Sequence, residues 1–354
     1  MKNNHSSPRV WIGNRLIADH QPPYVIAEMS CNHKGDKDIA IRLIHEAASA
    51  GANAIKLQTY TPETMTIDCD RPDFKISGGL WDGLTLYELY QKAYTPWEWT
   101  ADIFDAGRKL GLDVFSSPFD ETAVDFLEDF DPPAYKIASL ELTDGVLLKK
   151  VAATGKPVIL STGLASEDEI QAAVTVLNDA GASAIILLHC ISGYPTNIAD
   201  ANITLIPHLK KRFGLVTGLS DHSQGSIVAT GAVALGARVI EKHLVLDRND
   251  GSLDVAFSHE PHEFKDLVMN CFKAFQSLGK VNHNPVANEE ETRKYRRSLY
   301  IVKDCRKGDV LTPENLRRIR PGLGMPADRY EDMLGKTINK NLVRGTPLSP
   351  DDIS

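Results

Sequence analysis

Three side chains that can carry acid–base or metal chemistry stand at the ends of short apolar segments. Glu28 closes the segment in YVIAEMS, His222 follows the one in LVTGLSDHS, and His243 closes the one in RVIEKHL. When parallel strands close into a barrel, their carboxyl ends meet at one rim, and barrel enzymes carry their chemistry there. These positions predict an enzyme pocket.

The two histidines have the chemistry of a divalent metal site. Glu241 and His243 are two residues apart, so the alternation of strand side chains points both to the same side. Together with His222 from a neighbouring strand, they could hold one cation, with water in the open positions. A single histidine would more simply be a hydrogen-bonded core residue, but two beside a carboxylate favour a metal site.

Lysines and hydroxyl groups at other strand ends predict an anion site. Lys56 and Gln58 share one face of the second strand, and Lys136 lies on the fourth. A lysine inside a barrel is costly to bury unpaired, so a phosphate or carboxylate is its natural partner. Serine and threonine residues at other strand ends would add hydroxyl donors, although each of them taken singly could equally be an ordinary loop residue. They are Ser116, Ser117, Ser139, Ser161, Thr162 and Ser220. Lys136 could alternatively be the nucleophile of a Schiff-base aldolase.

Eight short apolar segments would position these groups. They begin near residues 24, 54, 112, 134, 157, 184, 215 and 238, and segments with helical periodicity lie between them. Most of the helical segments end in a glycine, which can adopt the left-handed conformation that terminates a helix. Eight strand–helix units in series predict an α/β fold, a closed (β/α)8 TIM barrel. The alternative, an open Rossmann-like sheet, is disfavoured because no GxGxxG follows the first strand.

One connection departs from this regular spacing. The second and third strands start 58 residues apart, and the loop between them contains the aromatic sequence GGLWDGLTLYELYQKAYTPWEW. Because this loop leaves the functional rim, it is either a packing lid or a wall that shapes the substrate pocket.

The C-terminal part contains a short internal repeat. GDVLTPENL recurs as GTPLSPDDI, and in each copy Thr312 or Ser349 precedes a proline and an acid, which is typical of a helix N-cap. A small pseudo-symmetric domain follows from this repeat. We therefore expect a barrel at 1–284, a polar linker at 285–297 and the small domain at 298–354.

Composition limits the function classes. The chain has 354 residues, 42% of them hydrophobic, and 47 acidic against 39 basic residues give a net charge of −8 with no basic run, which argues against a nucleic-acid partner. It has neither an apolar stretch of roughly 20 residues nor a secretory signal, so we expect a cytoplasmic protein that is not in a membrane. The five cysteines form no CxxC pair and are expected to be reduced.

The ordered motifs resemble those of the sialic acid synthase family. They are AEMSCNHKG, IKLQTY, FSSPFD, YKIAS, STG, YPT, GLSDHS, GARVIEKH and RPG, and they extend from about residue 22 to the C-terminus. The resemblance implies a TIM barrel followed by an antifreeze-like (SAF, β-clip) domain. It also implies a transferase that condenses phosphoenolpyruvate with the open-chain aldehyde of an N-acylated amino sugar, giving a nine-carbon 2-keto acid and phosphate.

The resemblance also assigns roles to matching residues. His222 and His243 would bind a divalent ion, manganese or alternatively magnesium or cobalt, that polarises the aldehyde. The catalytic residues would be Glu28, which steers or deprotonates the attacking water, and Asp254, near the sugar and the metal-bound water. Phosphoenolpyruvate would be held by Lys56, Lys136, Ser139, Ser161 and Ser220, and the sugar would be contacted by Gln58, Tyr194 and Arg320.

Arg320, in RIRPG, implies a domain-swapped homodimer. It matches the family arginine that reaches from the SAF domain of one subunit into the pocket of the other; the alternative is a solvated surface arginine. A non-catalytic sugar-binding protein is a further alternative, because a SAF domain alone could be a binding module. His33, His189 and Cys31 lie near the rim without an assigned role.

Within the family, the aromatic insertion looks like that of pseudaminic acid synthases. Ser192 stands in HCISGYPT where the N-acetylneuraminate branch has an asparagine, which supports the same branch. The substrate would then be 2,4-diacetamido-2,4,6-trideoxy-L-altrose, and the product a bacterial surface and flagellin sugar. Legionaminic acid synthase and N-acetylneuraminate synthase are the alternatives.

Overall fold

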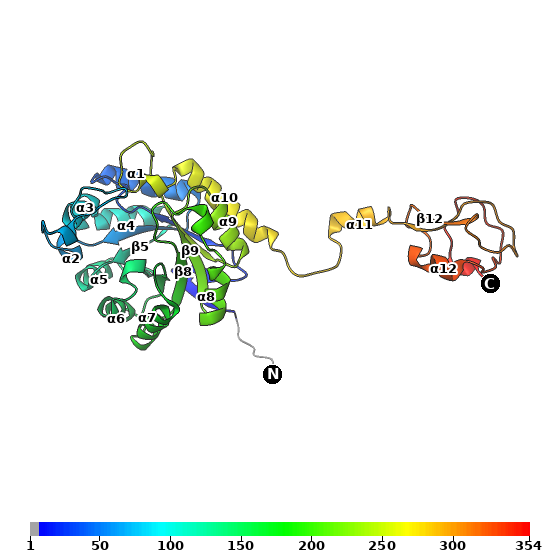
Figure 1. Cartoon of the computed structure of the whole chain (residues 1–354), viewed down its shortest axis with the longest axis horizontal. Helices are drawn as coiled ribbons and strands as arrows, with labels where there is room; N and C mark the ends of the chain where they lie inside the picture. Colours follow the sequence, from blue (N-terminus) through cyan, green and yellow to red (C-terminus); the bar gives the residue numbers. More distant parts are fainter. Residues whose placement is uncertain (1–6) are drawn as a thin grey trace. The chain divides into compact units, whose positions relative to one another are not determined.

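The computed structural model describes residues 7–354, which form two compact units that divide after Gly279. The first contains eight parallel strands in the order β5-β4-β3-β10-β9-β8-β7-β6, and β5 and β6 lie side by side, so the sheet is a nearly closed barrel (Figure 1). This confirms the predicted TIM barrel. The strands are β3 (Tyr24–Glu28), β4 (Ala54–Thr59), β5 (Asp113–Pro118), β6 (Tyr135–Ile137), β7 (Val158–Ser161), β8 (Ile185–Cys190), β9 (Val216–Asp221) and β10 (Val239–His243).

Helices follow the strands and cover the outside of the barrel. Their ends carry the expected signals: the Asp36 side chain caps the first helix, and Gly51, with φ of 88°, ends it in the left-handed region. Gly214 ends a later helix in the same way, with φ of 68°. The outer helices are α1 (Lys37–Ala50), α4 (Thr100–Lys109), α5 (Glu121–Glu128), α6 (Gly145–Ala152), α7 (Glu167–Asp179), α8 (Leu205–Phe213), α9 (Ile227–Ala234) and α10 (Pro261–Ser277).

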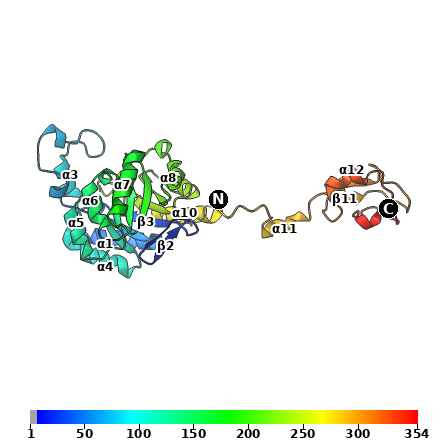
Figure 2. The same ribbon diagram turned by 90° about the horizontal axis from the view of Figure 1, so that it is seen from below.

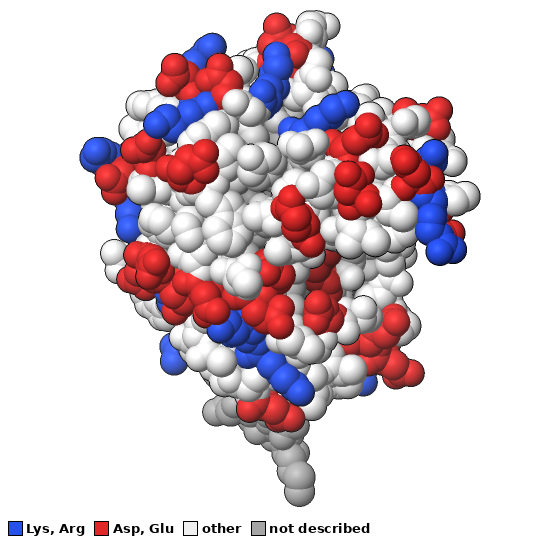
Figure 3. All heavy atoms as spheres, turned by 90° about the vertical axis from the view of Figure 1, so that its left-hand side faces the viewer, with Lys and Arg blue, Asp and Glu red and all other residues white. Residues whose placement is uncertain are grey.

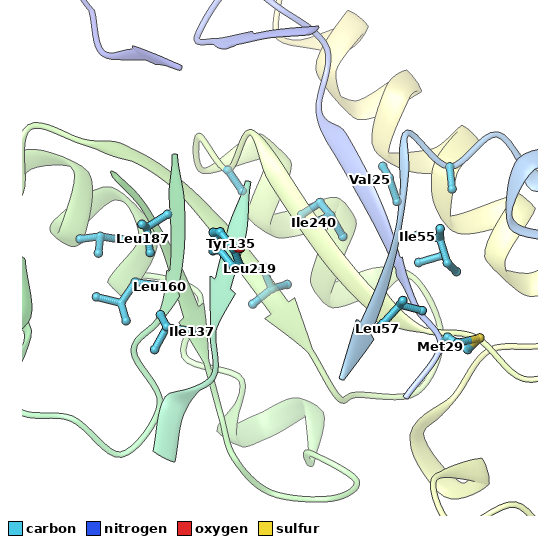
Figure 4. Packing of buried hydrophobic residues seen from close by; sticks show 14 of the residues in the cluster. Val25, Met29, Ile55, Leu57, Tyr135, Ile137, Leu160, Leu187, Leu219 and Ile240 are labelled. Carbon is cyan, nitrogen blue, oxygen red and sulfur yellow. The ribbon is translucent and has the colours of Figure 1, made fainter. Parts of the chain in front are cut away.

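The hydrophobic core has two layers because strand side chains alternate between the two faces of the sheet. The outer layer lies between strands and helices, and Figure 4 shows part of it around Val25, Ile55, Tyr135, Leu187 and Ile240. The inner layer fills the barrel with Tyr24, Ile26, Ala54, Phe115, Ala134, Ile159, Ile186, Leu188, Val216 and Val239.

A hairpin that the sequence analysis did not predict closes the amino-terminal end of the barrel. Strands β1 (Arg9–Ile12) and β2 (Arg15–Ala18) are antiparallel, and Val10, Ile12 and Ile17 belong to the same buried cluster as the inner strand residues. With this end filled by apolar side chains, polar groups inside the barrel can gather only toward the carboxyl ends of the strands.

The long insertion after β4 folds into short helices anchored to the barrel. It contains α2 (Pro62–Met65), η1 (Pro72–Phe74), α3 (Leu86–Ala93) and η2 (Trp97–Trp99), and Figure 2 shows α3 and its loops projecting from the barrel. The buried ring of Tyr60 packs edge-on against Tyr90 at 5.7 Å and against Phe119 at 5.2 Å. Trp97 donates to the Tyr60 carbonyl at 3.1 Å, so aromatic contacts hold both ends of the insertion.

The second unit has its own core around Leu299, Ile301, Leu311, Leu316 and Ile338. Ser349 caps η7, as the internal repeat predicts, whereas the Thr312 hydroxyl accepts from the Glu314 N–H within a turn. The predicted linker range, 285–297, contains the helix α11. The elements are α11 (Ala287–Arg293), β11 (Ser298–Ile301), β12 (Leu316–Ile319), η6 (Ala327–Arg329), α12 (Tyr330–Met333) and η7 (Pro350–Asp352). Across residues 7–354, no helix combines the length and apolarity needed to cross a membrane.

Candidate active site

One pocket at the carboxyl ends of the strands brings together eleven of the twelve predicted site residues. Alternation within the strands places the strand residues among them on the inner face of the barrel, above the apolar inner core, and Ser139, Tyr194, His222 and Asp254 come from the segments that follow the strands. The eleven are Glu28, Lys56, Gln58, Lys136, Ser139, Ser161, Tyr194, Ser220, His222, His243 and Asp254. Arg320 belongs to the second unit, where it is exposed just after β12, and its assignment stays a prediction.

The floor of the pocket is a buried network of two carboxylates and two lysines. Lys56 Nζ lies 2.7 Å from Glu28 Oε2 and 3.5 Å from Glu241 Oε1. Lys136 Nζ lies 3.8 Å from the same Glu241 oxygen. Glu241 thus sits between the two lysines, so our interpretation of Glu241 as a metal-site carboxylate gives way to one in which it holds the ammonium groups.

Burial and charge act in opposite directions on these carboxylates. Burial raises the pKa of Glu28, and the Lys56 ammonium only partly offsets it. Burial also acts to raise the pKa of Glu241, but Lys136 and Lys56 outweigh it and leave that pKa below its ordinary value. The lysines therefore favour the charged form of Glu241, whereas burial favours proton uptake by Glu28.

Hydroxyl groups surround the lysines. Lys56 Nζ donates to Ser117 Oγ at 3.3 Å, and Ser220 donates to Glu241 at 3.3 Å. The Ser161 hydroxyl is buried in the pocket, and within residues 7–354 it has no hydrogen-bond partner. A buried hydroxyl without a partner is costly, so an anion at this position would satisfy Ser161 as well as the lysines.

The rings of the two histidines are neighbours, with centroids 5.3 Å apart and planes tilted by 56°. His222 Nδ1 lies 3.0 Å from the Ile191 carbonyl, which can only accept, so this nitrogen carries the proton and Nε2 keeps its lone pair. His243 Nδ1 is buried and, in the described part of the chain, lacks a hydrogen-bond partner. Burial, together with His222 and the nearby lysines, holds the pKa of His243 well below its usual range. His243 is therefore suited to be a neutral metal ligand. Burial acts to lower the pKa of His222 as well, but the contact with Cys190 outweighs it and leaves that pKa above its ordinary value, so His222 can bind a metal through Nε2 only in its neutral form.

The histidines form a pair, with no full protein ligand set around them. Among residues 7–354, no group of three or more His, Cys, Asp or Glu side chains lies close enough together to hold a metal ion. Asp254 Oδ2 lies 3.7 Å from His243 Nδ1. The residues fit a divalent ion bound by two imidazoles, with its other positions left for water and substrate oxygen.

A chain of hydrogen bonds connects the acid near the histidines to Glu28. Ser30 Oγ donates to Asp254 Oδ2 at 2.6 Å, and Gln58 Nε2 donates to Ser30 Oγ at 3.1 Å and to Glu28 Oε1 at 3.0 Å. The sequence analysis assigned no role to Ser30. It lies two residues after Glu28 in the AEMS motif, but no spacing or residue type distinguishes it from a loop serine.

An aromatic group adjoins the histidines on the side facing the rim. The Tyr194 ring lies 4.6 Å from that of His222 and 5.1 Å from that of Phe257. Trp81, from the insertion, lies 6.1 Å from Tyr194 and donates its indole N–H to the Leu253 carbonyl at 3.3 Å. The insertion therefore reaches across the pocket to the loop that carries Asp254.

A buried ion pair lies behind the histidines. Asp221 and Lys242 are paired in the register of β9 and β10 and come immediately before His222 and His243 in the chain. Lys242 Nζ lies 3.1 Å from Asp221 Oδ2 and also donates to the Ser223 carbonyl. Neither side chain is more than 2% exposed, so this pair joins the two strand ends from outside the barrel.

The three residues that the sequence left without a role differ in position. His33 lies 3.1 Å from Thr95 and accepts from the Gly35 N–H, and His189 hydrogen-bonds the Ala201 carbonyl at 2.8 Å. Both histidines therefore have local structural partners. Cys31 is buried and lines the pocket.

Comparison with known proteins identifies the family. The model of the NeuB family matches residues 43–283, and that of the SAF domain matches residues 296–354. The chain belongs to the NeuB family. Both the family predicted from the motifs and the barrel followed by a SAF domain are thereby confirmed.

Individual NeuB relatives match over nearly the whole chain. The pseudaminic acid synthase of Helicobacter pylori is 43% identical over 94% of this chain and 98% of its own length. The N,N'-diacetyllegionaminic acid synthase of Campylobacter jejuni is 35% identical over 90% of this chain and 96% of its own. The crystal structure of N-acetylneuraminic acid synthetase from Leptospira borgpetersenii in complex with citrate superposes with a TM-score of 0.73 at 34% identity, covering 82% of this chain and 96% of that one.

Proposed function

We propose that this protein is a pseudaminic acid synthase. It condenses phosphoenolpyruvate with 2,4-diacetamido-2,4,6-trideoxy-L-altrose and releases pseudaminic acid and phosphate. The observation that carries the proposal is the 43% identity to a pseudaminic acid synthase across almost the full length of both chains, against 35% to a diacetyllegionaminic acid synthase. The pocket supports it, because an anion site, a pair of imidazoles and a buried carboxylate meet there.

Phosphoenolpyruvate would occupy the lysine and hydroxyl side of the pocket. Lys56 and Lys136 provide two ammonium groups, and Ser139, Ser161 and Ser220 provide hydroxyl donors around them. The partnerless hydroxyl of Ser161 supports this placement, since a phosphate or carboxylate oxygen would accept its hydrogen bond.

His222 and His243 would hold a divalent ion, which we propose to be manganese. When bound, it supplies Lewis-acid polarisation of the sugar aldehyde. The imidazoles would fix the position of the ion, and the Tyr194 ring packs against that of His222. Gln58, whose amide nitrogen donates to Glu28 and Ser30, would offer its amide oxygen to the sugar.

Glu28 would act as the base. The enol carbon of phosphoenolpyruvate forms a bond to C1 of the sugar, the aldehyde oxygen becomes an alkoxide, and C2 of the donor gains cationic character. Water adds to C2 and gives one proton to Glu28, which then yields it to convert the alkoxide to a hydroxyl. The C–O bond to phosphate breaks, and the proton of the C2 hydroxyl leaves with the phosphate, so that a 2-keto group remains. The raised pKa of Glu28 and its contact with Lys56 suit this role, and Asp254 lies beside His243 on the sugar side.

We also propose that two chains share their active sites in a domain-swapped homodimer, with Arg320 completing the pocket of the partner. Charge supports the association. Residues 1–279 contain 36 acidic and 24 basic residues, whereas residues 280–354 contain 11 acidic and 15 basic ones. The barrel face in Figure 3 accordingly shows more acidic than basic side chains. A basic small domain is attracted to an acidic barrel surface.

Phosphate release tests the function directly. With manganese and phosphoenolpyruvate, the altro sugar should be converted faster than its manno epimer or N-acetylmannosamine, and a chelator should stop the reaction until manganese is restored. Glu28→Gln should lower kcat by on the order of 100-fold or more while phosphoenolpyruvate still binds. Faster turnover of the manno epimer would instead identify a legionaminic acid synthase, and a borohydride-trapped adduct at Lys136 would identify an aldolase.

A further inference from the structure

We propose that the insertion between β4 and β5 forms a subsite for the terminal methyl group of a 6-deoxy sugar, and that this subsite selects against a 6-hydroxyl. This inference rests on the proposed function and concerns the end of the sugar farthest from the reacting carbon. The subsite is lined by four residues that we call the insertion wall, which are Met65 of α2 and Leu89, Tyr90 and Ala93 of α3. Trp81, also from the insertion, lines the pocket beside this wall.

The fold determines the direction in which an open-chain sugar extends. Its aldehyde carbon must lie near His222 and His243 and near the donor held by Lys56 and Lys136, all of which stand on strand ends. Beneath them the barrel is filled by the inner core, including Phe115. The remaining carbons can therefore run only outward, toward the rim that the insertion covers.

The insertion wall differs in chemistry from the floor. Leu89, Tyr90 and Ala93 lie on one face of α3, at positions i, i+1 and i+4, and Met65 comes from the end of α2. All four side chains are half-buried and line the pocket. The floor is made of ion pairs and hydroxyls, whereas this wall consists mainly of methyl, methylene and aromatic carbon, with the Tyr90 hydroxyl as the one polar group among its four side chains.

The insertion wall is held in place by contacts of its own. Tyr87 donates to Glu63 at 2.7 Å, which ties α3 to α2, and Tyr90 packs against the buried ring of Tyr60. Trp81 donates to the Leu253 carbonyl on the opposite side of the pocket. A wall fixed at several points cannot rearrange easily to offer a hydrogen-bond partner to a new hydroxyl.

A methyl group at C6 would be buried against carbon, and a hydroxymethyl group would lose its water there. A small apolar pocket rejects an added hydroxyl by up to about 100-fold. We therefore expect the 6-deoxy chain to bind about 10- to 100-fold more tightly than its 6-hydroxy counterpart.

Unreactive alditols test the subsite without turnover. The probes are 2,4-diacetamido-2,4,6-trideoxy-L-altritol and the same alditol with a 6-hydroxyl, and their dissociation constants are measured by calorimetry on the full chain. Met65→Gln and Leu89→Asn place an amide in the wall at nearly constant volume. Leu86→Asn is the matched control, because Leu86 is a half-buried leucine of the same helix that does not line the pocket.

The preference is measured as the dissociation constant of the 6-hydroxy alditol divided by that of the 6-deoxy alditol. This ratio should be the same in the wild type and in Leu86→Asn, and it should be at least fivefold smaller in Met65→Gln and in Leu89→Asn. Equal dissociation constants for both alditols in the wild type, or an unchanged ratio in both wall variants, would overturn the subsite. Because alditols cannot condense, a failure of the proposed synthase appears separately, as an absence of phosphate release from the reactive sugar.

Discussion

Glu241 is the residue on which the anion site depends, because both Lys56 and Lys136 approach the same carboxylate oxygen. Glu241→Gln removes the charge and leaves two buried ammonium groups close together. Removing one partner of a buried ion pair costs about 3 kcal/mol. We expect the variant to lose about this much in free energy of unfolding by urea, and phosphoenolpyruvate to stabilise it more than the wild type, because the ligand replaces the missing charge.

Glu141→Gln is the control for this prediction. Glu141 also lines the pocket, but among the described residues it forms no ion pair with a lysine. Its variant should show the same ligand-induced stabilisation as the wild type. Equal stabilisation of Glu241→Gln and wild type by phosphoenolpyruvate would mean that the lysines do not bind the donor.

Residue types and strand ends predicted where the polar groups gather, but they did not predict which groups pair. Glu241 and His243 share a strand face, and this made a joint metal site the simplest interpretation. The two lysines that Glu241 contacts come from β4 and β6, and only barrel closure brings them to it. Ser30 escaped notice for a related reason, since its partner Asp254 lies more than 200 residues away.

At the scale of elements, the Asp221–Lys242 pair holds the ends of β9 and β10 together behind the two histidines. Lys242→Met alone should destabilise the protein by about 3 kcal/mol, because Asp221 would remain buried without its counter-charge. Asp221→Asn with Lys242→Met removes both charges and should recover most of that stability. The double variant should nevertheless bind manganese about 10-fold more weakly, because groups behind metal ligands set the orientation of the ligands.

Urea unfolding and a manganese titration followed by electron paramagnetic resonance separate these two effects. Lys265→Met, at a solvent-facing position of α10, is a control that should change neither quantity. A double variant with wild-type manganese affinity would show that the pair serves folding alone and leaves the imidazole positions unaffected.

Most elements could be predicted because each carries a local signal. Apolar segments of strand length, helical periodicity and left-handed glycines such as Gly51 and Gly214 recur unit after unit. The hairpin β1–β2 has two short strands and little periodicity, and its stabilisation comes from distant inner-core residues. The path of the insertion is likewise set by long-range contacts, such as that from Trp81 to Leu253, which its own sequence does not reveal.

At the scale of the whole molecule, each unit has a hydrophobic core of its own, and the two differ in charge sign. Separate cores are what the proposed exchange of small domains between two chains requires. Opposite charges bring a small domain toward a barrel, and salt screens this attraction. If two chains share active sites, activity at low enzyme concentration should therefore fall as ionic strength rises, in parallel with the dimer fraction measured by sedimentation.

Subunit mixing tests the shared site most directly. Glu28 belongs to the barrel and Arg320 to the small domain, so Glu28→Gln and Arg320→Ala place one lesion in each unit. In a heterodimer with composite sites, one site receives both lesions and the other receives neither, so random mixing of the two parents should restore about one quarter of the wild-type sites. Each parent alone should stay impaired, and unmixed parents combined just before the assay are the control. If verified heterodimers show no activity above that of the parents, Arg320 does not complete the partner's pocket, and each chain works with the groups of its own barrel.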